Sequence, residues 1–471
     1  MKQDNVMTRR EMIRVGGSAT VAAGLVHPWS AGHGGPQRKK LALRITNPDE
    51  KVIDAHMPTP PTLKNEFPPS VVTVGGRRWL FIGSNHSVVV PIPANTHILK
   101  DPECSVRSPE IYTIGGAVHE IRLGRLPVLH KIPADEYWRH TYCGTFNVDV
   151  MPKDRKNPEW VFSINHCENK NLSWKTGFTK WFTTNSINPA DEATPKTTSG
   201  AWGEGGKFMD YQPAYFGLVS MSYAPVTAET QYGAELFHHD MGPIIWPQMG
   251  FMTPDGSKKN PAYTNPHSHP SSLIAEDPND GKTYVYVWAN ISGIRPGDHN
   301  MIGAARSPIE SRGLPGTFAN YYQGDYTEPS LPANMNQDIS ILRTLKGGKA
   351  DPIHPSAQGR INRFFAARLK RSGLFLSVES YNDTDSSAKD YKETALRLSH
   401  DLRTWTDRIP VPGTRSYKSY GRMDPPFAFY YPKFLSADGS SHYEIDESKP
   451  FYIIGTKPHE VVYRELEIDI I

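Results

Sequence analysis

The chain has 471 residues, and its 52 lysines and arginines nearly balance 49 aspartates and glutamates, for a net charge of +3. This balance excludes the concentrated basic surface of a nucleic-acid-binding protein, and the three cysteines exclude disulfide-dense, iron–sulfur and cysteine-rich zinc proteins. No apolar run reaches the roughly 18–20 residues of an integral membrane span, and 38 glycines with 41 prolines disfavour a helical bundle.

The first 35 residues are similar to a twin-arginine export signal. Arg9 and Arg10 precede a mild apolar stretch at 15–26 that is rich in glycine and alanine. We therefore expect residues 1–35 to be a signal peptide, and the protein to be periplasmic or extracellular in a bacterium. The alternative is a disordered N-terminus of a cytoplasmic protein. The remaining residues, 36–471, are predicted to form a single domain.

Apolar runs, each followed by a polar turn and a second apolar run, recur five times, as in β-hairpins. Asp-Gly dipeptides, as at Asp280-Gly281 and Asp438-Gly439, are strong hairpin signals between such runs. The predicted strand pairs are 70–74 with 79–83, 146–151 with 160–164, 271–276 with 283–288, 364–369 with 374–378, and 429–435 with 450–455.

A third β-like run follows each hairpin, at 119–126, 216–226, 299–309, 393–405 and 460–469. Five such units predict an all-β fold, a five-bladed β-propeller. The N-terminal run at 40–46 would add a strand to the last blade and close the ring. A long insertion is expected at about 170–215. The alternative fold is a two-sheet sandwich or two β domains.

Cys143 and Cys167 lie twelve residues on either side of Arg155. If 143–167 is one hairpin with its tip near Arg155, the two sulfurs face each other, and an exported protein would oxidise them to a disulfide. Cys104 would remain a buried thiol. The alternative is three reduced, separately buried cysteines.

Three segments resemble the five-bladed β-propeller glycoside hydrolases, the broad group that includes families 32, 43, 62 and 68. They are His-Pro-Ser-Ser-Leu-Ile at 269–274, Met-Ile-Gly-Ala-Ala-Arg-Ser at 301–307, and Leu-Ser-His-Asp-Leu-Arg-Thr-Trp-Thr at 398–406. The last is similar to the recurring Ser-x-Asp-Leu-x-x-Trp-Thr third strand of those enzymes. The resemblance implies a carbohydrate substrate that binds near the propeller axis.

In such a propeller, the inner strand of each blade starts at the face to which the second strand returns. Polar residues at these strand ends are therefore expected to converge on one axial pocket. The predicted substrate-binding residues are Asn85, His86, Asn147, Asn169, Trp174, His269 and Asp424. For Trp174, in the insertion, stacking on a sugar is the functional interpretation and packing beneath the loop is the alternative.

Two carboxyl groups must flank the bond in glycoside hydrolysis, at ~5–5.5 Å for retention or ~6.5–9.5 Å for inversion. Asp149 lies inside an apolar strand, where an unpaired carboxylate is costly. We predict Asp149 as base or nucleophile and Glu168 as acid, with structural salt bridges as the alternative. Asp240 is a third catalytic candidate, and Glu379 is a reserve candidate for the acid.

The function predicted is that of an exported glycoside hydrolase acting on a polysaccharide or oligosaccharide. No cofactor and no metal site are predicted, although a structural calcium ion is possible. His238, His239 and Asp240 are adjacent and would point to opposite faces of a strand, which disfavours shared ligation. The alternatives are a non-catalytic carbohydrate-binding or surface-interaction propeller, and a periplasmic cofactor enzyme. The sequence leaves the oligomeric state open.

Overall fold

The computed structural model describes an all-β chain in separate segments. The residues described are 41–46, 69–74, 76–82, 87–92, 97–100, 119–121, 142–169, 216–225, 239–246, 268–291, 301–331, 347–353, 360–384, 390–414, 416–417, 429–457 and 460–471. The predicted signal peptide and insertion lie outside these residues.

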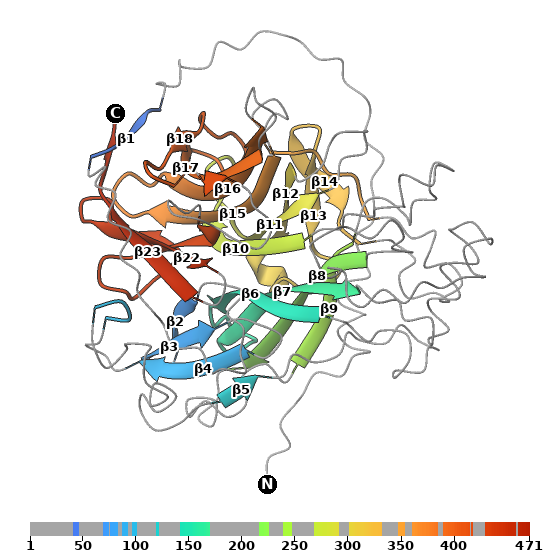
Figure 1. Cartoon of the computed structure of the whole chain (residues 1–471). Coiled ribbons are helices and arrows are strands. Elements are labelled where there is room, and N and C mark those ends of the chain that lie inside the picture. The colour runs from blue at the N-terminus through green and yellow to red at the C-terminus, as the bar shows by residue number, and fades with distance from the viewer. Residues whose placement is uncertain are drawn as a thin grey trace, which may run out of the picture.

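Three sheets follow one another in the first part of the chain (Figure 1). The first contains β2 (Ser70–Val74), β3 (Arg77–Ile82), β4 (Ser87–Ile92) and β5 (His119–Ile121). The second contains β6 (Tyr142–Met151), β7 (Trp160–Asn169), β8 (Phe216–Pro225) and β9 (His239–Ile245). The third contains β10 (Ser268–Glu276), β11 (Thr283–Ile291), β12 (Met301–Pro308), β13 (Ala319–Tyr322) and β14 (Asp325–Pro329), with the 3-10 helix η5 (Ile309–Ser311) after β12.

A fourth sheet, a three-stranded fifth sheet and a separate two-stranded pair complete the described fold. The fourth sheet contains β15 (Arg360–Leu369), β16 (Phe375–Thr384), β17 (Asp390–Ser399), β18 (Ile409–Pro410), β19 (Ser416–Tyr417) and β21 (Glu444–Ile445). The fifth contains β20 (Tyr430–Leu435), β22 (Phe451–Lys457) and β23 (Glu460–Leu466). β1 (Leu43–Ile45) and β24 (Ile468–Ile470) form a separate pair.

The sheets are arranged as a propeller. The first strand of each sheet contacts the first strand of the next, so that β2, β6, β10, β15 and β20 lie side by side around a common axis. Lys433 Nζ on β20 donates a 2.9 Å hydrogen bond to Ser70 Oγ on β2, which joins the fifth sheet to the first. The predicted all-β propeller is confirmed. Of the five blades predicted, four have four or more strands among the described residues, and the fifth sheet has three.

Glycines at the hairpin tips explain two of the turns. Gly281 has φ +68° and Gly373 has φ +69°, a backbone conformation that only glycine adopts without strain. The Gly281 N–H donates to Asp277 O at 2.8 Å, and the Gly373 N–H donates to Leu369 O at 3.1 Å. These bonds close the turns between β10 and β11 and between β15 and β16, where the sequence predicts them.

Apolar side chains fill the spaces between neighbouring sheets. Phe162 and Ile164 on β7 pack in one cluster with Val285 and Val287 on β11. Trp288 on β11 packs in another cluster with Phe364 on β15, and the fourth and fifth sheets share a third cluster. Each fully buried side chain of this size contributes about 1.5–3 kcal/mol, so these layers hold the blades together.

The first sheet differs from its prediction. The structure places β4 between β3 and β5, so the run predicted as the third strand, 119–126, supplies the fourth. Pro91 lies within β4 opposite Trp79, and a proline in a short apolar run argues against an inner strand in sequence reasoning.

The N-terminal strand closes the fold in a different way from the prediction. β1 pairs antiparallel with β24, with Leu43 opposite Ile470. This pairing links the N-terminal run to the last strand, but it forms a two-stranded sheet of its own instead of the fourth strand of β20, β22 and β23. The Arg44 guanidinium donates to the Asp469 carboxylate at 2.6 Å across the pair.

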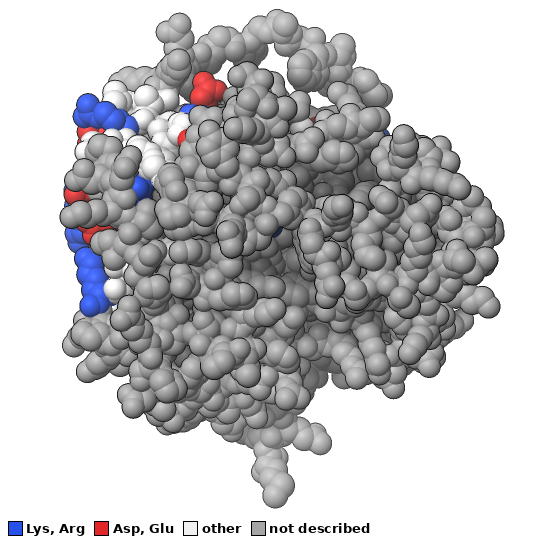
Figure 2. All heavy atoms as spheres, in the orientation of Figure 1, with Lys and Arg blue, Asp and Glu red and all other residues white. Residues whose placement is uncertain are grey.

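The surface near this pair carries both signs of charge. Figure 2 shows basic and acidic side chains interspersed along the edge of the molecule that lies beside β1 in Figure 1. The exposed ion pairs include Lys370 with Glu444 at 3.3 Å and Arg371 with Asp446 at 2.9 Å. In the part of the chain that the structure describes, no helix has the length and apolarity needed to cross a membrane.

Candidate functional site

Four of the five first strands contain a register shift close to their start. The shifts lie between Thr145 and Asn147 in β6, Ser268 and Ser271 in β10, Ile361 and Arg363 in β15, and Tyr430 and Lys433 in β20. β-bulges re-aim side chains and are common beside active sites. Their shared position places four irregular backbone segments around the same end of the propeller axis.

The side chains at these bulges meet in one cluster, which we call the mouth: Phe146, His166, His269, Arg363 and Tyr431. The Phe146 ring centroid lies 5.5 Å from that of His269 and 5.3 Å from that of Tyr431. His166, near the end of β7, stacks on His269 at 5.1 Å with an interplanar angle of 27°. Strands from three sheets therefore supply one aromatic and imidazole cluster, in which Phe146 and His166 are buried.

Arg363 completes the mouth from the fourth sheet. Its guanidinium carbon lies 4.2 Å from the Tyr431 ring centroid, and its Nη2 donates to the Tyr431 hydroxyl at 3.0 Å. Beneath these groups is a cavity of about 20 Å³. It is lined by Phe146, His269, Pro270, Ser271, Arg363, Phe364, Phe365, Tyr431, Pro432 and Lys433.

Two mouth residues have an unusual backbone conformation. His269 has φ +55° and Tyr431 has φ +53°, in the left-handed region that L-residues seldom adopt. Each is followed by a proline, Pro270 or Pro432, at its bulge. Such strain persists only where surrounding structure holds it, and it gathers at functional sites. The backbone therefore marks the same end of the axis as the side chains do.

Below the mouth, a buried polar network joins the sheets across the axis. The Asn147 amide nitrogen donates to Ser272 Oγ at 2.8 Å, and its Oδ1 lies 3.1 Å from His442 Nε2. Ser70 and Lys433 extend the network to the first and fifth sheets. Asn147, predicted to bind substrate, is thus fully buried and structural.

Burial shifts the titration of the two basic groups in this network. Burial lowers the pKa of Lys433 to about 7. Burial, followed by the positive charge of Lys433, lowers the pKa of His442 to about 3. Both shifts reflect removal of the charged forms from water. At neutral pH, His442 is therefore neutral and Lys433 is only partly protonated.

Asp149 lies further along β6 than Asn147, towards the hairpin tip. It is 3% exposed, and its Oδ1 accepts a 2.7 Å hydrogen bond from the Val150 N–H. Its Oδ2 has no hydrogen-bond partner among the described residues. Burial, with the negative charge of Glu444 adding to it, raises the pKa of Asp149 to about 7. A carboxyl in this setting is a buried acid and not part of the mouth.

The predicted pairing of Asp149 with Glu168 is wrong. Asp149 lies opposite Phe162, whereas Glu168 lies opposite Tyr142 at the other end of the hairpin. The six residue steps along β7 from Phe162 to Glu168 span about 20 Å at ~3.3 Å per residue. This is about twice the largest separation of a catalytic carboxyl pair. The apolar pattern predicts Asp149 near the start of its strand, but β6 begins earlier, at Tyr142.

Asp240 is also placed away from the axis. It lies on β9, the outermost strand of the second sheet, opposite Ser222. At ~4.8 Å between neighbouring strands, β9 is about 14 Å from β6. Asp240 is therefore not one of the residues that the fold brings to the mouth.

Glu379, the reserve candidate, is a structural anion. It is fully buried, accepts a 3.1 Å hydrogen bond from Arg397 Nε, and accepts another from Arg408 Nε. Arg397 is 1% exposed, so the two charges neutralise each other inside the fourth sheet. Glu379 is therefore enclosed by two guanidiniums within the fourth sheet and is not one of the mouth residues.

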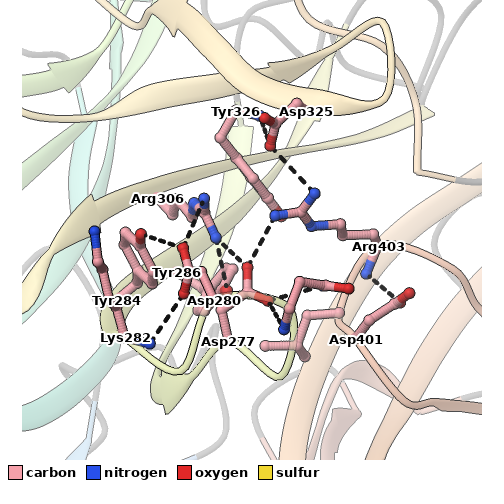
Figure 3. Close-up of polar contacts among 12 residues, drawn as sticks. Asp277, Asp280, Lys282, Tyr284, Tyr286, Arg306, Asp325, Tyr326, Asp401 and Arg403 are labelled. Atoms are coloured by element: carbon pink, nitrogen blue, oxygen red, sulfur yellow. Dashed lines mark hydrogen bonds and ion pairs between the residues drawn. The ribbon is translucent and has the colours of Figure 1, made fainter.

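A cluster of charged side chains lies at the hairpin tips (Figure 3). Asp277, which is fully buried, accepts hydrogen bonds from Arg306 and from Arg403, the latter at 3.0 Å. Arg306 comes from the third sheet and Arg403 follows β17 of the fourth. Hydrogen bonds hold the pKa of Asp277 below its usual value. These residues fasten two blades together at the end of β10 opposite to the mouth.

For several predicted site residues, the structure describes only the backbone; for others, it describes nothing. Asn85, His86, Trp174 and Asp424 lie outside the described residues. Glu168 and Asn169 end β7, two and three residues beyond His166, so their backbone reaches the mouth end. Cys143 lies directly opposite Cys167, as predicted, and the disulfide itself stays a prediction.

Sequence reasoning missed Phe146 and Tyr431 and named only His269 of the mouth among its substrate-binding residues. The signal that could have found Tyr431 is the aromatic–proline step at the start of an apolar run, Tyr431-Pro432, which parallels His269-Pro270. Proline inside a strand is confined to edges and bulges. Two such steps at equivalent places in two repeats point to equivalent bulges.

No family model and no curated protein matches the chain. Among solved structures, it is similar to an exo-1,5-α-L-arabinanase from a bovine ruminal metagenomic library, with 10% identity, a TM-score of 0.35, and coverage of 88% of this chain and 94% of that chain. An α-L-arabinanase from Cellvibrio cellulosa has 6% identity and a TM-score of 0.36, with 88% and 96% covered. A family 62 α-L-arabinofuranosidase from Coprinopsis cinerea has 7% identity and a TM-score of 0.33, with 87% and 95% covered. The propeller assignment rests on the strand order and contacts of the chain itself.

Proposed function

We propose that the protein is an exported glycoside hydrolase that acts on a polysaccharide or oligosaccharide at the mouth. The observation that carries the proposal is the convergence of four bulged first strands on one cluster of aromatic, imidazole and guanidinium groups. Aromatic faces stack on the C–H faces of sugars, and the polar tips of His269, Arg363 and Tyr431 offer hydrogen bonds to hydroxyls. We further propose that β20, β22 and β23 are the fifth blade.

The catalytic assignment changes with the register of the second sheet. Glu168 follows His166 on β7, at the end of the strand that reaches the mouth, so it remains the proposed acid. Asp149 is removed from the catalytic pair. Asp424, six residues before the start of β20 in the sequence, is tested as a source of the second carboxyl.

The test is a screen of the full protein against neutral and acidic glycans, with reducing-end release as the readout. Glu168→Gln is expected to lower kcat by about 10²–10⁴-fold, the usual contribution of a general acid. Asp149→Asn is expected to leave kcat within about tenfold of wild type, because the group lies about 20 Å along the hairpin from Glu168. Loss of activity in Asp149→Asn with full activity in Glu168→Gln would reverse the assignment.

A non-catalytic carbohydrate-binding propeller is the second candidate. It is favoured by the composition of the mouth, whose described side chains are aromatic, imidazole and guanidinium, with no carboxyl among them. Glycan binding without turnover, unchanged in Glu168→Gln and lost in His269→Ala, would establish this alternative.

We propose that no cofactor takes part, and that residues 1–35 direct export through the twin-arginine route. Activity is then expected to survive treatment with EDTA followed by gel filtration. Replacing Arg9 and Arg10 together by lysine is expected to retain the protein in the cytoplasm, as fractionation and immunoblotting would show. Loss of activity after chelation, restored by calcium, would instead assign a metal requirement.

A further inference from the structure

We propose that the mouth binds the anionic group of an acidic glycan, a carboxylate or a sulfate ester. This inference rests on the proposed carbohydrate function and names its substrate class. The described lining of the axial cavity is cationic or neutral, with Arg363, Lys433 and His269 as basic residues and Tyr431 as a hydroxyl donor.

Arg363 is held in a shape suited to an anion. Its guanidinium carbon lies over the Tyr431 ring, 4.2 Å from the centroid, and Nη2 donates a 3.0 Å hydrogen bond to the Tyr431 hydroxyl. A guanidinium presents five donors in a rigid fork that matches the paired oxygens of a carboxylate or sulfate. Holding the fork by stacking reduces the entropy lost when the ligand binds.

The size of the cavity also favours a small charged group. Its volume of about 20 Å³ accommodates one water-sized molecule, and it is too small for a sugar ring. An oxygen atom of an appended carboxylate or sulfate can enter, while the rest of that group and the sugar ring stay outside, beside His269. His269 stacks on the buried imidazole of His166 at 5.1 Å, which holds its ring in place beside the cavity.

Lys433 is a second group that would respond to a bound anion, by taking up a proton. Its ammonium lies 2.9 Å from Ser70 Oγ, and burial lowers its pKa to about 7. A nearby negative charge favours the protonated form of a lysine. Binding of an anionic glycan near pH 7.5 is therefore expected to take up protons, whereas a neutral glycan would not cause this uptake.

The experiment measures binding by calorimetry, with tetragalacturonate, its carboxyl-reduced tetramer and a κ-carrageenan tetrasaccharide as probes. Wild-type protein is expected to bind one anionic probe about 10–100-fold more tightly than the neutral tetramer, the range of a hydrogen-bonded charged contact. The preference is expected to fall with added salt. The carboxylate and sulfate probes distinguish the two sources of charge.

Variants separate this inference from the proposed function. Arg363→Gln is expected to bring the anionic and neutral affinities within about twofold, Arg363→Lys to retain part of the preference, and Arg371→Gln, at an exposed turn, to change neither. A wild-type preference for the neutral tetramer, or an anionic preference that survives Arg363→Gln in a protein of wild-type Tm, overturns the anion site and leaves the glycosidase proposal standing. Failure of every glycan to bind would overturn both.

Discussion

Lys433 Nζ lies 2.9 Å from Ser70 Oγ, and this hydrogen bond joins the last large sheet to the first across 363 residues of sequence. The ammonium is fully buried, together with Asn147 and His442 of the same network. The ring of sheets is therefore closed at its axis by polar contacts, while apolar layers hold neighbouring sheets together further out.

Lys433→Met is expected to change how stability depends on pH. Burial holds the pKa of Lys433 near 7, below its usual 10.5, so the folded state binds fewer protons than the unfolded state between these values. Its contribution to stability is complete above pH 10.5 and is lost as the pH falls through about 7. Between pH 7 and 9.5, the free energy of unfolding of the wild type is expected to rise by about 3 kcal/mol relative to the methionine variant. Urea unfolding of both proteins measures this, and parallel curves would contradict it.

Asp149→Asn is expected to show the opposite sign. Burial raises the pKa of Asp149 to about 7, so the contribution of the group to stability is complete below pH 3.8 and is lost as the pH rises through about 7. Relative to wild type, the asparagine variant is expected to gain about 3–4 kcal/mol between pH 4 and pH 7.5. Thermal or urea unfolding across this range measures the difference.

Asp438 provides a matched control for Asp149. Hydrogen bonds from Ser436 and Ser440 outweigh burial and hold the pKa of Asp438 at about 2. Its contribution is present above pH 3.8 and is lost as the pH falls through about 2. Asp438→Asn is therefore expected to lose stability relative to wild type as the pH rises from 2 to 4. If the difference between Asp149→Asn and wild type stays constant from pH 4 to pH 7.5, the Asp149 carboxyl is solvated and its pKa is not raised.

Glu379→Gln is expected to destabilise the fourth sheet. The substitution leaves Arg397, at 1% exposure, without its carboxylate partner, and breaking a buried pair in this way costs about 3–5 kcal/mol. Asp469→Asn removes the exposed partner of Arg44 and is expected to cost at most about 1 kcal/mol. Differential scanning calorimetry compares the two, and equal Tm values would contradict the structural role of Glu379.

The exported protein is expected to contain one free thiol and one disulfide. Cys143 lies directly opposite Cys167 in the hairpin, and Cys104 remains as the third cysteine. Thiol titration in denaturant is expected to give one reactive thiol before reduction and three after it. Cys167→Ser is expected to lower stability by about 2–4 kcal/mol, whereas Cys104→Ser leaves the disulfide intact. Three thiols before reduction would show that the pair is reduced.

The sequence was most informative where local chemistry fixes structure. Turn residues such as Asp277 to Gly281 predict a hairpin because the turn needs a positive φ, as at Gly281, which few residues other than glycine adopt without strain. The symmetric spacing of Cys143 and Cys167 predicts their register, because antiparallel strands that share a turn pair residues at equal distances from it.

The candidate site was less predictable than the fold because its side chains lie at β-bulges, where the strand pairing is irregular. A bulge shifts every later side chain to the other face of its strand, and apolar periodicity does not reveal where the shift occurs. The assignment of Asp149 was wrong because the true start of β6 lies four residues before the predicted run at Phe146. The role of Asn147 depends on Ser272 and His442, which are 125 and 295 residues away in sequence.

The contacts that close the ring also set an order for folding. The β1–β24 pair and the Lys433–Ser70 bond join residues 425 and 363 positions apart, so neither can form until almost the whole chain has been synthesised. The early blades can fold from local contacts, but β2 at the inner edge of the first sheet has no β20 to contact until the last sheet has been synthesised. For most of its synthesis, the nascent chain therefore has an incomplete ring with exposed apolar surface. A chaperone that binds β2 until β20 has been synthesised would raise the yield of folded protein.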